Sequence, residues 1–534
     1  MIPGTLLDTA TAQALDFAWL VKALAPASEY GRRVFAECAP FTRGDEERAS
    51  ERSCVIDALA RAADAARLDA VREALRAAPD ASGAVARASM GDVLGDAALF
   101  ELQRFCDAVA RVDSLLEGIA PAGAIGSAAV RETALALEGG RAGKFGFYLA
   151  DGFDPALRQA RERAARLQAE LDAARGRAVE RAARELGRDD AGGDEFIVMR
   201  ADVRALPAGV RVLREAPTYY LCALEYDEPT LAAMGRRDEA VDAVAAAEER
   251  VRVALSETVR ARSAELDRSA RRLGETDVLV AAARFARTFD CRPARIVRRA
   301  SVSFEGARFL PLADELESSG RHFTPIDVEL HDVAVLTGPN MGGKSVCLRT
   351  CGFVVMCAAF GLPVPAARAE TALFDEIAWL GIGTDDGVSG GLLSSFAREV
   401  VRLRDVMARP ARNAFVLVDE FARTTTPHEG KALLIALIEA LRDRGACGMV
   451  ATHLGGVASD AGVRHFAVRG LRGIPERPAV ADLGEALASL ARSMDYTIVE
   501  VGDGQSEARA DAIALAALLG LDAGLIEAAY RALK

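Results

Sequence analysis

The chain has 534 residues, 51% of them hydrophobic and 27% charged, which allows roughly three or four soluble domains of ordinary size. The formal net charge of −12 argues against binding of nucleic acid through bulk positive charge, although it is compatible with a local basic stripe. Nine cysteines without a CxxC pair predict reduced thiols in a cytoplasmic protein. No uncharged apolar run reaches the roughly 18 residues of a membrane span, and the first residues do not form a secretory signal, so no membrane contact is expected.

Residues 1–150 are predicted to be a helical core or lever. Stretches rich in alanine, leucine and arginine recur with helical spacing, and breaks fall near Pro26, Pro40 and Pro79. No pattern in this part indicates chemistry. We therefore expect it to act as a scaffold.

Residues 151–275 are predicted to form a helical clamp arm with a small β-containing tip near residues 195–230. Apolar residues recur at spacings of three and four along 154–188 and again along 236–273, as in a coiled-coil seam. The two stripes are Leu157, Ala160, Ala164, Leu167, Leu171, Ala174 and Ala178, and Val241, Val244, Val251, Leu255, Val259 and Leu266. Three runs between them, Phe196–Met199, Val210–Leu213 and Thr218–Tyr226, indicate short strands. The same pattern also fits an ordinary helical hairpin inside a globule.

Residues 276–534 are predicted to be an α/β domain with a parallel sheet at its core. From about residue 296, short apolar runs alternate with helical segments, which is the rhythm of βαβ units. The runs are Ala334–Leu336, Phe415–Val418 and Gly448–Ala451, and the helices cover 345–360 and 431–443. The expected fold class is therefore α/β, preceded by an all-α part and the arm.

A glycine-rich loop follows the apolar strand Val333–Thr337. Its sequence, Gly338-Pro-Asn-Met-Gly-Gly-Lys-Ser345, fits the P-loop pattern GxxxxGK[ST], and a helix follows at once. Backbone N–H groups and the helix N-terminus of such a loop surround phosphate oxygens. Lys344 is expected to contact the β- and γ-phosphates of ATP, and the Ser345 hydroxyl to ligate Mg²⁺. The expected ATP-binding residues are Gly338, Pro339, Asn340, Met341, Gly342, Gly343, Lys344 and Ser345.

Two adjacent carboxylates end the apolar strand Phe415–Val418. Asp419 is expected to hold Mg²⁺, usually through water, and Glu420 to orient or deprotonate the water that attacks the γ-phosphate. His453, which closes a further strand, is expected to sense the γ-phosphate or to position this water. With Lys344, Glu420 and His453 form the predicted catalytic set of an enzyme that hydrolyses ATP to ADP and phosphate.

A further segment, Ser389-Gly-Gly391, resembles the core of the signature motif of ABC-type ATPases. That motif opens a helix and caps the γ-phosphate of the nucleotide bound by a second subunit. The order of phosphate loop, signature, Asp-Glu pair and histidine is that of the ABC superfamily, which includes MutS-like proteins. The resemblance implies trans contacts from Ser389, Gly390, Gly391 and Ser394, and it leaves open which serine acts.

The segment Thr337–Ser345 resembles the MutS family, in which TGPNMGGKS is close to a fingerprint. The likeness continues through Ser394–Glu399, Asp419–Arg423 and Ala451–His453. Phe323 precedes the loop where the family places an aromatic ring on adenine, although a core phenylalanine is the alternative. The resemblance implies an ABC-type ATPase domain, ATP and Mg²⁺ as cofactors, and a homodimer or a dimer with a related subunit.

The chain also departs from the family pattern. The mismatch-reading and connector domains of the family precede its helical core, and this chain has no room for them, so it looks like a short member without the mismatch-reading domain. Ala422 and Thr424 stand where the family usually has glycines after the Asp-Glu pair.

The resemblance leaves the client of the ATPase open. The stretch Asp419–Thr425 and the short domain plan look similar to a MutS-like subgroup associated with reactivating adenosylcobalamin-dependent lysine or ornithine aminomutases, and we favour this reactivase interpretation. The alternative is a DNA-binding ATPase of the mismatch-repair or recombination type. In that case, Arg200, Arg204, Arg211 and Arg214 would contact backbone phosphates of mismatched or branched DNA. A purely regulatory ATPase partner is a third possibility.

Overall fold

The computed structural model describes the chain apart from residues 2–3, 5, 120–124, 143–145, 188–194, 340–341, 382–394, 410–412, 472–493, 503–512, 514–515, 518–520 and 534. The chain forms two compact units. Unit 1 comprises Met1–Ala77, Val112–Ala124 and Arg271–Lys534, and unit 2 comprises Ala78–Arg111 and Ile125–Ala270. No helix within the described residues is long and apolar enough to cross a membrane.

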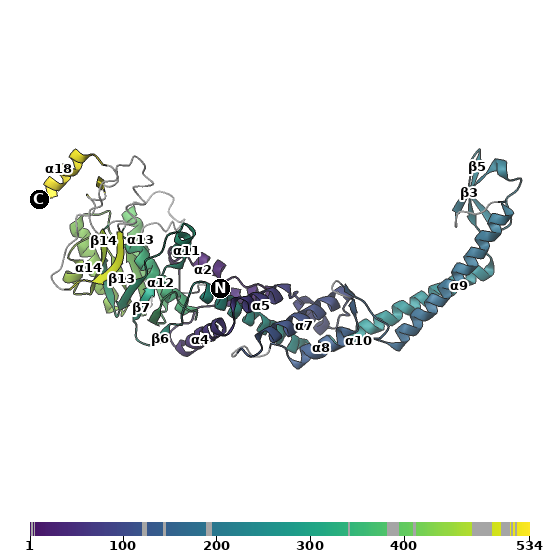
Figure 1. Cartoon of the computed structure of the whole chain (residues 1–534), viewed down its shortest axis with the longest axis horizontal. Helices are drawn as coiled ribbons and strands as arrows, with labels where there is room; N and C mark the ends of the chain where they lie inside the picture. The colour runs from purple at the N-terminus through teal and green to yellow at the C-terminus, as the bar shows by residue number, and fades with distance from the viewer. Residues whose placement is uncertain are drawn as a thin grey trace. The chain divides into compact units, whose positions relative to one another are not determined.

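The first half of the chain is mostly helical (Figure 1). Its helices are α1 (Thr9–Ala14), α2 (Phe17–Ala23), α3 (Glu29–Glu37), α4 (Glu46–Ala62), α5 (Ala65–Ala77), α6 (Ser82–Met90), α7 (Asp96–Leu116), α8 (Ala128–Glu138), α9 (Pro155–Glu185), the short 3₁₀ helix η1 (Arg200–Asp202) and α10 (Glu228–Thr288). Its strands are β1 (Arg141–Ala142), β2 (Gly146–Phe147), β3 (Glu195–Met199), β4 (Val210–Glu215) and β5 (Tyr219–Leu224). Helices α7 and α10 contribute residues to both units.

The second half of the chain alternates strands and helices. Its strands are β6 (Arg295–Val297), β7 (Val302–Ala307), β8 (Ile326–Leu330), β9 (Val333–Thr337), β10 (Arg368–Ala372), β11 (Glu376–Gly381), β12 (Ala414–Asp419), β13 (Cys447–Ala451), β14 (His465–Leu471) and β15 (Met494–Glu500). Its helices are α11 (Leu310–Ser318), α12 (Lys344–Ala359), α13 (Ser395–Met407), α14 (Pro427–Asp443), α15 (Val457–Ala461) and α18 (Ala523–Leu533). The α/β class expected from the sequence is confirmed, while the predicted three-part division into domains stays a prediction.

The centre of unit 1 is a six-stranded sheet in the order β11-β12-β13-β9-β14-β15. The first five strands pair in parallel, and β15 pairs antiparallel with β14. A second, four-stranded sheet has the order β6-β10-β7-β8. Parallel strands need helical crossovers, which cover both faces of such a sheet.

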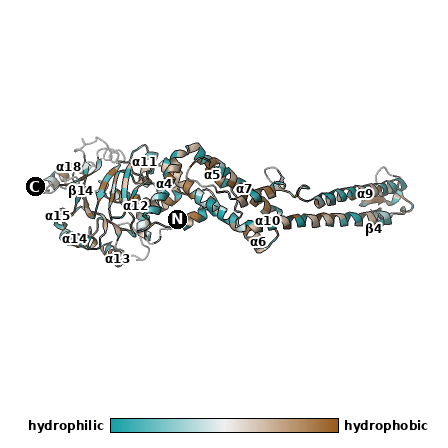
Figure 2. Cartoon of the chain, turned by 90° about the horizontal axis from the view of Figure 1, so that it is seen from below, coloured by the Kyte–Doolittle hydropathy of each residue, from teal (hydrophilic) through white to brown (hydrophobic). Residues whose placement is uncertain are grey.

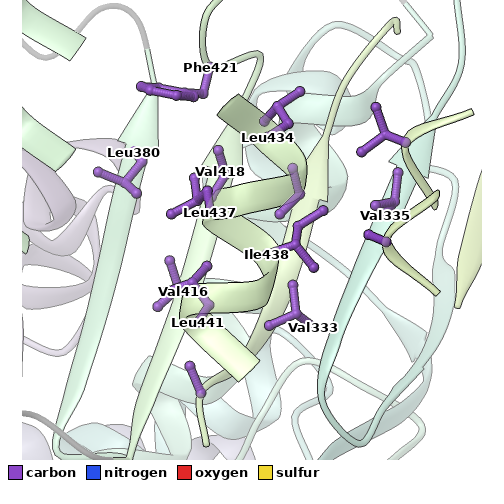
Figure 3. Close-up of a cluster of buried hydrophobic side chains, with 14 of the residues drawn as sticks. Val333, Val335, Leu380, Val416, Val418, Phe421, Leu434, Leu437, Ile438 and Leu441 are labelled. Carbon is purple, nitrogen blue, oxygen red and sulfur yellow. The ribbon is translucent and has the colours of Figure 1, made fainter. Parts of the chain in front are cut away.

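The two faces of the central sheet are buried under different helices. Val416 and Val418 of β12 point to one face, where they pack with Leu434 and Ile438 of α14 (Figure 3). The intervening Leu417 lies against Gly352 of α12, where an added Cβ would approach its side chain to 2.8 Å. The alternation along β12 therefore fixes α12 and α14 on opposite faces, and it holds the end of β12 in register with the ends of its neighbours.

In unit 2, α9 and the first part of α10 run side by side, and the three-stranded sheet β3-β5-β4 lies at one end of the pair (Figure 1). Leu157 and Leu171 of the predicted seam are fully buried, and Arg161 of α9 forms an ion pair with Glu248 of α10 at 2.7 Å. Much of α9 is hydrophilic (Figure 2). The inner face of the small sheet packs on the end of α9 through a cluster of buried residues: Ala182, Ala183, Leu186, Phe196, Val198, Cys222 and Leu224.

Candidate nucleotide site

Three parallel strands bring the predicted site residues to one edge of the central sheet. Asp419 at the end of β12 pairs in register with Ala451 of β13, and Ala451 pairs with Leu336 of β9. The segments that follow these strands therefore start next to one another. In parallel α/β sheets, ligands bind at this carboxyl edge.

The glycine-rich loop leads from β9 into α12, and glycine is required where the loop meets its surroundings. Gly343 has φ 90°, in the left-handed region, and a Cβ there would lie 3.1 Å from the Tyr496 ring. A Cβ at Gly342 would lie 2.8 Å from the carbonyl oxygen of Pro339. A side chain at either position would thus deform the loop that precedes the N-terminus of α12.

Lys344 is the first residue of α12 and is only 5% exposed. Its Nζ donates hydrogen bonds to the carbonyl oxygens of Gly338 at 3.0 Å and Pro339 at 3.1 Å. It also forms an ion pair with Glu420 Oε1 at 3.2 Å. The ammonium group therefore lies against the backbone at the start of the loop and directly beside Glu420, the second carboxylate of the Asp-Glu pair.

The two adjacent carboxylates differ in their electrostatics. Burial raises the pKa of Asp419, against the opposing effect of a hydrogen bond from the Ser345 hydroxyl. Burial would also raise the pKa of Glu420, but the Lys344 ammonium, with smaller effects from Arg423 and His453, brings it below its usual value. At Asp419, burial outweighs the opposing effects of Ser345, Lys344 and Arg349, whereas Glu420 is held ionised by its neighbours.

The Asp419 carboxylate and the Ser345 hydroxyl can accommodate a Mg²⁺ ion. They are hard oxygen donors placed together, and Asp419 Oδ1 is buried with no hydrogen-bond partner in the described part of the chain. Mg²⁺ is usually bound through one or two carboxylates, with substrate phosphates and water supplying the remaining oxygens. Among the described residues, no cluster of three or more His, Cys, Asp and Glu side chains could hold a metal ion.

His453 lies beyond the end of β13 and is exposed. It acts electrostatically on Glu420, so these two predicted catalytic residues belong to the same group of charges. The neighbouring Thr452 is 1% exposed, and its backbone N–H donates to the Leu336 carbonyl oxygen at 3.0 Å. The backbone before His453 is thereby tied to the strand that carries the loop.

Two further residues have no role assigned from the sequence: Tyr496 lies against the phosphate loop, and Glu399 lies against the segment after β12. Tyr496 of β15 lies against Gly343, and burial raises the pKa of its hydroxyl group. Glu399 of α13 is buried, and it accepts a hydrogen bond from the Ala422 backbone N–H at 2.8 Å. Glu399 belongs to a segment that resembles the MutS family, but no motif predicts its bond partner.

The remaining predicted residues are placed only in part. Phe323 is half-buried in the segment before β8, and its role on adenine stays a prediction. Arg321, two residues earlier, acts electrostatically on Tyr496. Because Tyr496 lies against Gly343, this segment lies near the phosphate loop. Asn340 and Met341 of the loop, and the signature residues Ser389, Gly390, Gly391 and Ser394, lie outside the described residues.

The comparisons with known proteins agree with this geometry. Residues 334–468 match the family model of MutS domain V. The Endonuclease MutS2 of Carboxydothermus hydrogenoformans is 34% identical over 199 residues, which cover 36% of this chain and 24% of the relative. The DNA mismatch repair protein MutS of Granulibacter bethesdensis is 33% identical over 234 residues, with 43% and 25% covered. The protein of that name from Natronomonas pharaonis is 29% identical over 457 residues, with 82% and 49% covered.

A strand, a glycine-rich loop and a helix, with an Asp-Glu pair ending a nearby parallel strand, define the P-loop class of nucleotide-binding domains. Within this class, residues 334–468 are similar to MutS domain V, and the stretches matched above make the chain similar to MutS and MutS2 proteins. The chain spans between 24% and 49% of the length of these three relatives.

Proposed function

We propose that the protein is a Mg²⁺-dependent ATPase whose nucleotide site is built from the loop Gly338–Ser345 and the pair Asp419 and Glu420. The observation that carries the proposal is the meeting of three groups at the carboxyl edge of one sheet: a buried lysine, a second, ionised carboxylate, and a buried carboxylate with one oxygen unpartnered among the described residues. Phosphoryl transfer needs such groups because its catalysis consists mainly of positioning and charge stabilisation.

The residues divide the work by position. Lys344 would exchange the two loop carbonyls and Glu420 for the β- and γ-phosphates, and so neutralise charge that develops in the transition state. Ser345 and Asp419 would hold Mg²⁺, which supplies further stabilisation of phosphate charge when it is bound. Glu420, released from Lys344, would accept a proton from the attacking water or orient it, and His453 would contact the same water or the γ-phosphate.

A dimer follows from the same proposal. If Ser389, Gly390, Gly391 and Ser394 form an ABC-type signature, they complete the site of a second subunit, so ATP would join two copies and hydrolysis would release them. We infer a homodimer or a pair with a related subunit. This arrangement would couple the nucleotide state to a client molecule.

Two clients have support. The relatives reported above are named for DNA mismatch repair and for endonuclease activity, which favours DNA. The small sheet of unit 2 leaves Ile197, Met199 and Leu213 more than 40% exposed, and such apolar exposure favours contact with a protein. A cobalamin-dependent aminomutase as that protein rests on the resemblance of the stretch Asp419–Thr425, and the comparisons add no support for it.

Steady-state ATP hydrolysis by the purified chain tests the proposal. We expect Mg²⁺-dependent turnover, and a loss of about a hundredfold or more in Glu420→Gln, because the amide accepts no proton. Binding of Mg²⁺-ATP should persist in this variant. Glu439→Gln, an exposed change on α14, is the matched control and should hydrolyse ATP at the wild-type rate. Equal rates for Glu420→Gln and wild type would refute the assignment.

The same assay distinguishes the clients. Mismatched or branched duplex DNA should stimulate turnover, with an effect that declines steeply as salt rises, if DNA is the client. Stimulation by an inactivated aminomutase, with no response to DNA, would instead establish the reactivase. Stimulation by neither would remove both clients while leaving the ATPase measurement intact.

A further inference from the structure

Glu399 is a buried acid outside the predicted catalytic set. It lies on α13 and is 8% exposed. Its Oε2 accepts a hydrogen bond from the Ala422 backbone N–H at 2.8 Å, and its Oε1 is buried without a hydrogen-bond partner among the residues that the structure describes. Burying a carboxylate with one oxygen unsatisfied is unfavourable, so the position of Glu399 requires an explanation other than stability.

The partner of Glu399 lies in a backbone segment of unusual conformation. Glu420 has φ 52° and Ala422 has φ 62°, although neither residue is a glycine. In this left-handed region, Cβ approaches the backbone carbonyl oxygen too closely, and residues other than glycine persist there only when their surroundings hold them. Two such residues, separated only by Phe421, show that contacts with other segments hold the backbone after β12 in a conformation that glutamate and alanine rarely adopt.

Hydrogen bonds hold this segment at several points. The Glu420 backbone N–H donates to the Ala451 carbonyl oxygen at 3.0 Å, which ties its start to β13. The Ala422 N–H donates to Glu399, and the Thr425 N–H donates to the Ala422 carbonyl oxygen at 3.3 Å. Without Glu399, the Ala422 N–H would lose its acceptor, and the left-handed turn could relax toward a conformation that alanine prefers.

Relaxation at Ala422 would change the surroundings of Glu420. The Glu420 carboxylate lies between two cations, with Oε1 at 3.2 Å from Lys344 Nζ and Oε2 at 3.2 Å from Arg423 Nη1. Arg423 directly follows Ala422, and it also acts electrostatically on Glu399. A rotation of the Ala422 backbone therefore moves Arg423 and alters one of the two contacts that orient Glu420.

We propose that Glu399 is a positioning residue for ATP hydrolysis. Its carboxylate holds Ala422 in the left-handed conformation and so keeps Glu420 and Arg423 in their places at the nucleotide site. Glu399 acts through the backbone of Ala422 and touches neither nucleotide nor water. This inference rests on the proposed ATPase function, and it assigns a role to a residue that lies on a different element from the Asp-Glu pair.

The test compares four variants with wild type: Glu399→Ala, Glu399→Gln, Glu399→Ala combined with Ala422→Gly, and the control Asp405→Ala. Asp405 is an exposed acid on the same helix. We expect Glu399→Ala to lower kcat about tenfold or more, because small misplacements of catalytic groups are costly, while the Kd for Mg²⁺-ATP stays within about threefold. Glu399→Gln keeps a carbonyl acceptor for the Ala422 N–H, and its kcat should remain within about threefold of wild type.

The double variant isolates the mechanism. Glycine adopts the left-handed conformation without the clash of a Cβ, so Ala422→Gly should restore much of the kcat that Glu399→Ala loses. A general loss of packing at Glu399 would not be corrected by this change. If Glu399→Ala reduces the folded fraction, Glu399→Leu fills the same space without accepting a hydrogen bond, and it carries the same expectation.

Hydrogen exchange provides a readout that does not depend on turnover. The Ala422 amide should exchange faster in Glu399→Ala than in wild type and Asp405→Ala, because its acceptor is gone. Wild-type protein without ATPase activity would refute the proposed function. The exchange rate of the Ala422 amide would still show whether Glu399 holds the backbone of this segment. An unchanged kcat in Glu399→Ala, or a lost kcat that glycine at 422 fails to restore, would overturn the positioning role.

Discussion

Asp419 and Glu420 are neighbours in the chain, yet their surroundings shift their pKa values in opposite directions. Burial dominates at Asp419 and raises its pKa, whereas Lys344 brings the pKa of Glu420 below its usual value. In the proposed function, the carboxylate assigned to Mg²⁺ is thus the one whose ionised form is destabilised by burial, and the carboxylate assigned to the attacking water is the one held ionised. Such opposed pairs are typical of functional sites, where stability is given up for chemistry.

The first prediction at this scale concerns the free energy of unfolding that the protein loses by burying the ionised Asp419 carboxylate. Its folded pKa lies above the unfolded value of about 4, so the native protein binds more protons than the unfolded chain between these two values. The penalty is therefore absent below the unfolded pKa and fully present above the raised folded pKa. Asp419→Asn should raise the free energy of unfolding at pH 7.5 by about 1 kcal/mol in EDTA, and the gain should shrink near pH 4.

Denaturant unfolding at both pH values checks this, with the exposed Asp443→Asn as the control. Mg²⁺-ATP should stabilise wild type and not Asp419→Asn, because the variant has lost a charged ligand for the ion. A variant that is less stable than wild type at pH 7.5 in EDTA would show that Asp419 has a stabilising partner and is not an unsatisfied ligand.

The sequence predicts site residues that belong to short motifs, and it does not predict those that reach the site through tertiary packing. Lys344, Asp419 and Glu420 belong to short motifs, and the structure brings all three together. Tyr496 and Glu399 reach the site only through sheet pairing and helix packing, which connect residues far apart in the chain. Glu399 lies in a segment that resembles the MutS family and Tyr496 in none, but no local pattern identifies the residue that either of them contacts.

At the scale of elements, the N-terminal segment completes the edge of the central sheet. Leu7 forms a parallel bridge with Ile377 of β11, and the Thr11 hydroxyl accepts a hydrogen bond from the Trp379 backbone N–H at 3.0 Å. Asp8, which caps α1, forms ion pairs with Arg402 at 2.6 Å and Arg409 at 2.7 Å. An edge strand is a site of unwanted pairing, and this segment covers it.

Asp8 carries the element-scale prediction. Burial alone would raise its pKa, but Arg402, the Thr11 backbone N–H and Arg409 together hold the pKa well below its usual range. The resulting stability is present above the unfolded pKa of about 4 and is lost as the pH falls from there toward the folded value. Asp8→Ala should cost about 2 kcal/mol of unfolding free energy at pH 7, and less at pH 3.5.

Chemical denaturation of wild type and Asp8→Ala at the two pH values measures this difference. Glu73→Ala is the control, because it breaks an ion pair with Arg76 that is exposed on both sides and should cost about 0.5 kcal/mol or less. A cost that does not depend on pH would mean that the ionised form of Asp8 contributes nothing to stability, through either its ion pairs or its cap on α1.

The helical elements show where periodicity alone falls short. Val241 belongs to the stripe expected for the second arm helix, but it is 46% exposed. Between Thr230 and Val251, the buried positions of α10 are alanines: Ala233, Ala240 and Ala247. Small residues let two helices approach closely. The predicted stripe consists of valines and leucines, so it leaves these alanines out. The β-rich tip was predictable because its strands alternate and are bounded by turns, whereas the contribution of the N-terminal segment to the sheet was not.

At the scale of the whole molecule, the question is what unit 2 binds. The small sheet offers exposed apolar residues and arginines together, and Arg200 is already engaged, since it pairs with Glu215 at 2.9 Å and lies over the Tyr220 ring. Arg204, Arg211 and Arg214 are exposed. If DNA is the client, these three are the residues that would contact its phosphates.

The last prediction tests that surface directly. Replacing Arg204, Arg211 and Arg214 together with alanine should weaken duplex binding and reduce the slope of log K against log salt by up to about 3, since each phosphate contact contributes about 0.9. Leu213→Ser changes an exposed neighbour on β4 without changing charge, so it should leave the slope as in wild type. Fluorescence anisotropy across a salt series measures both. If the triple variant binds duplex with the wild-type slope, the arginines do not contact phosphates. A loss of protein-client binding in Leu213→Ser would then make the apolar face of the small sheet the contact surface.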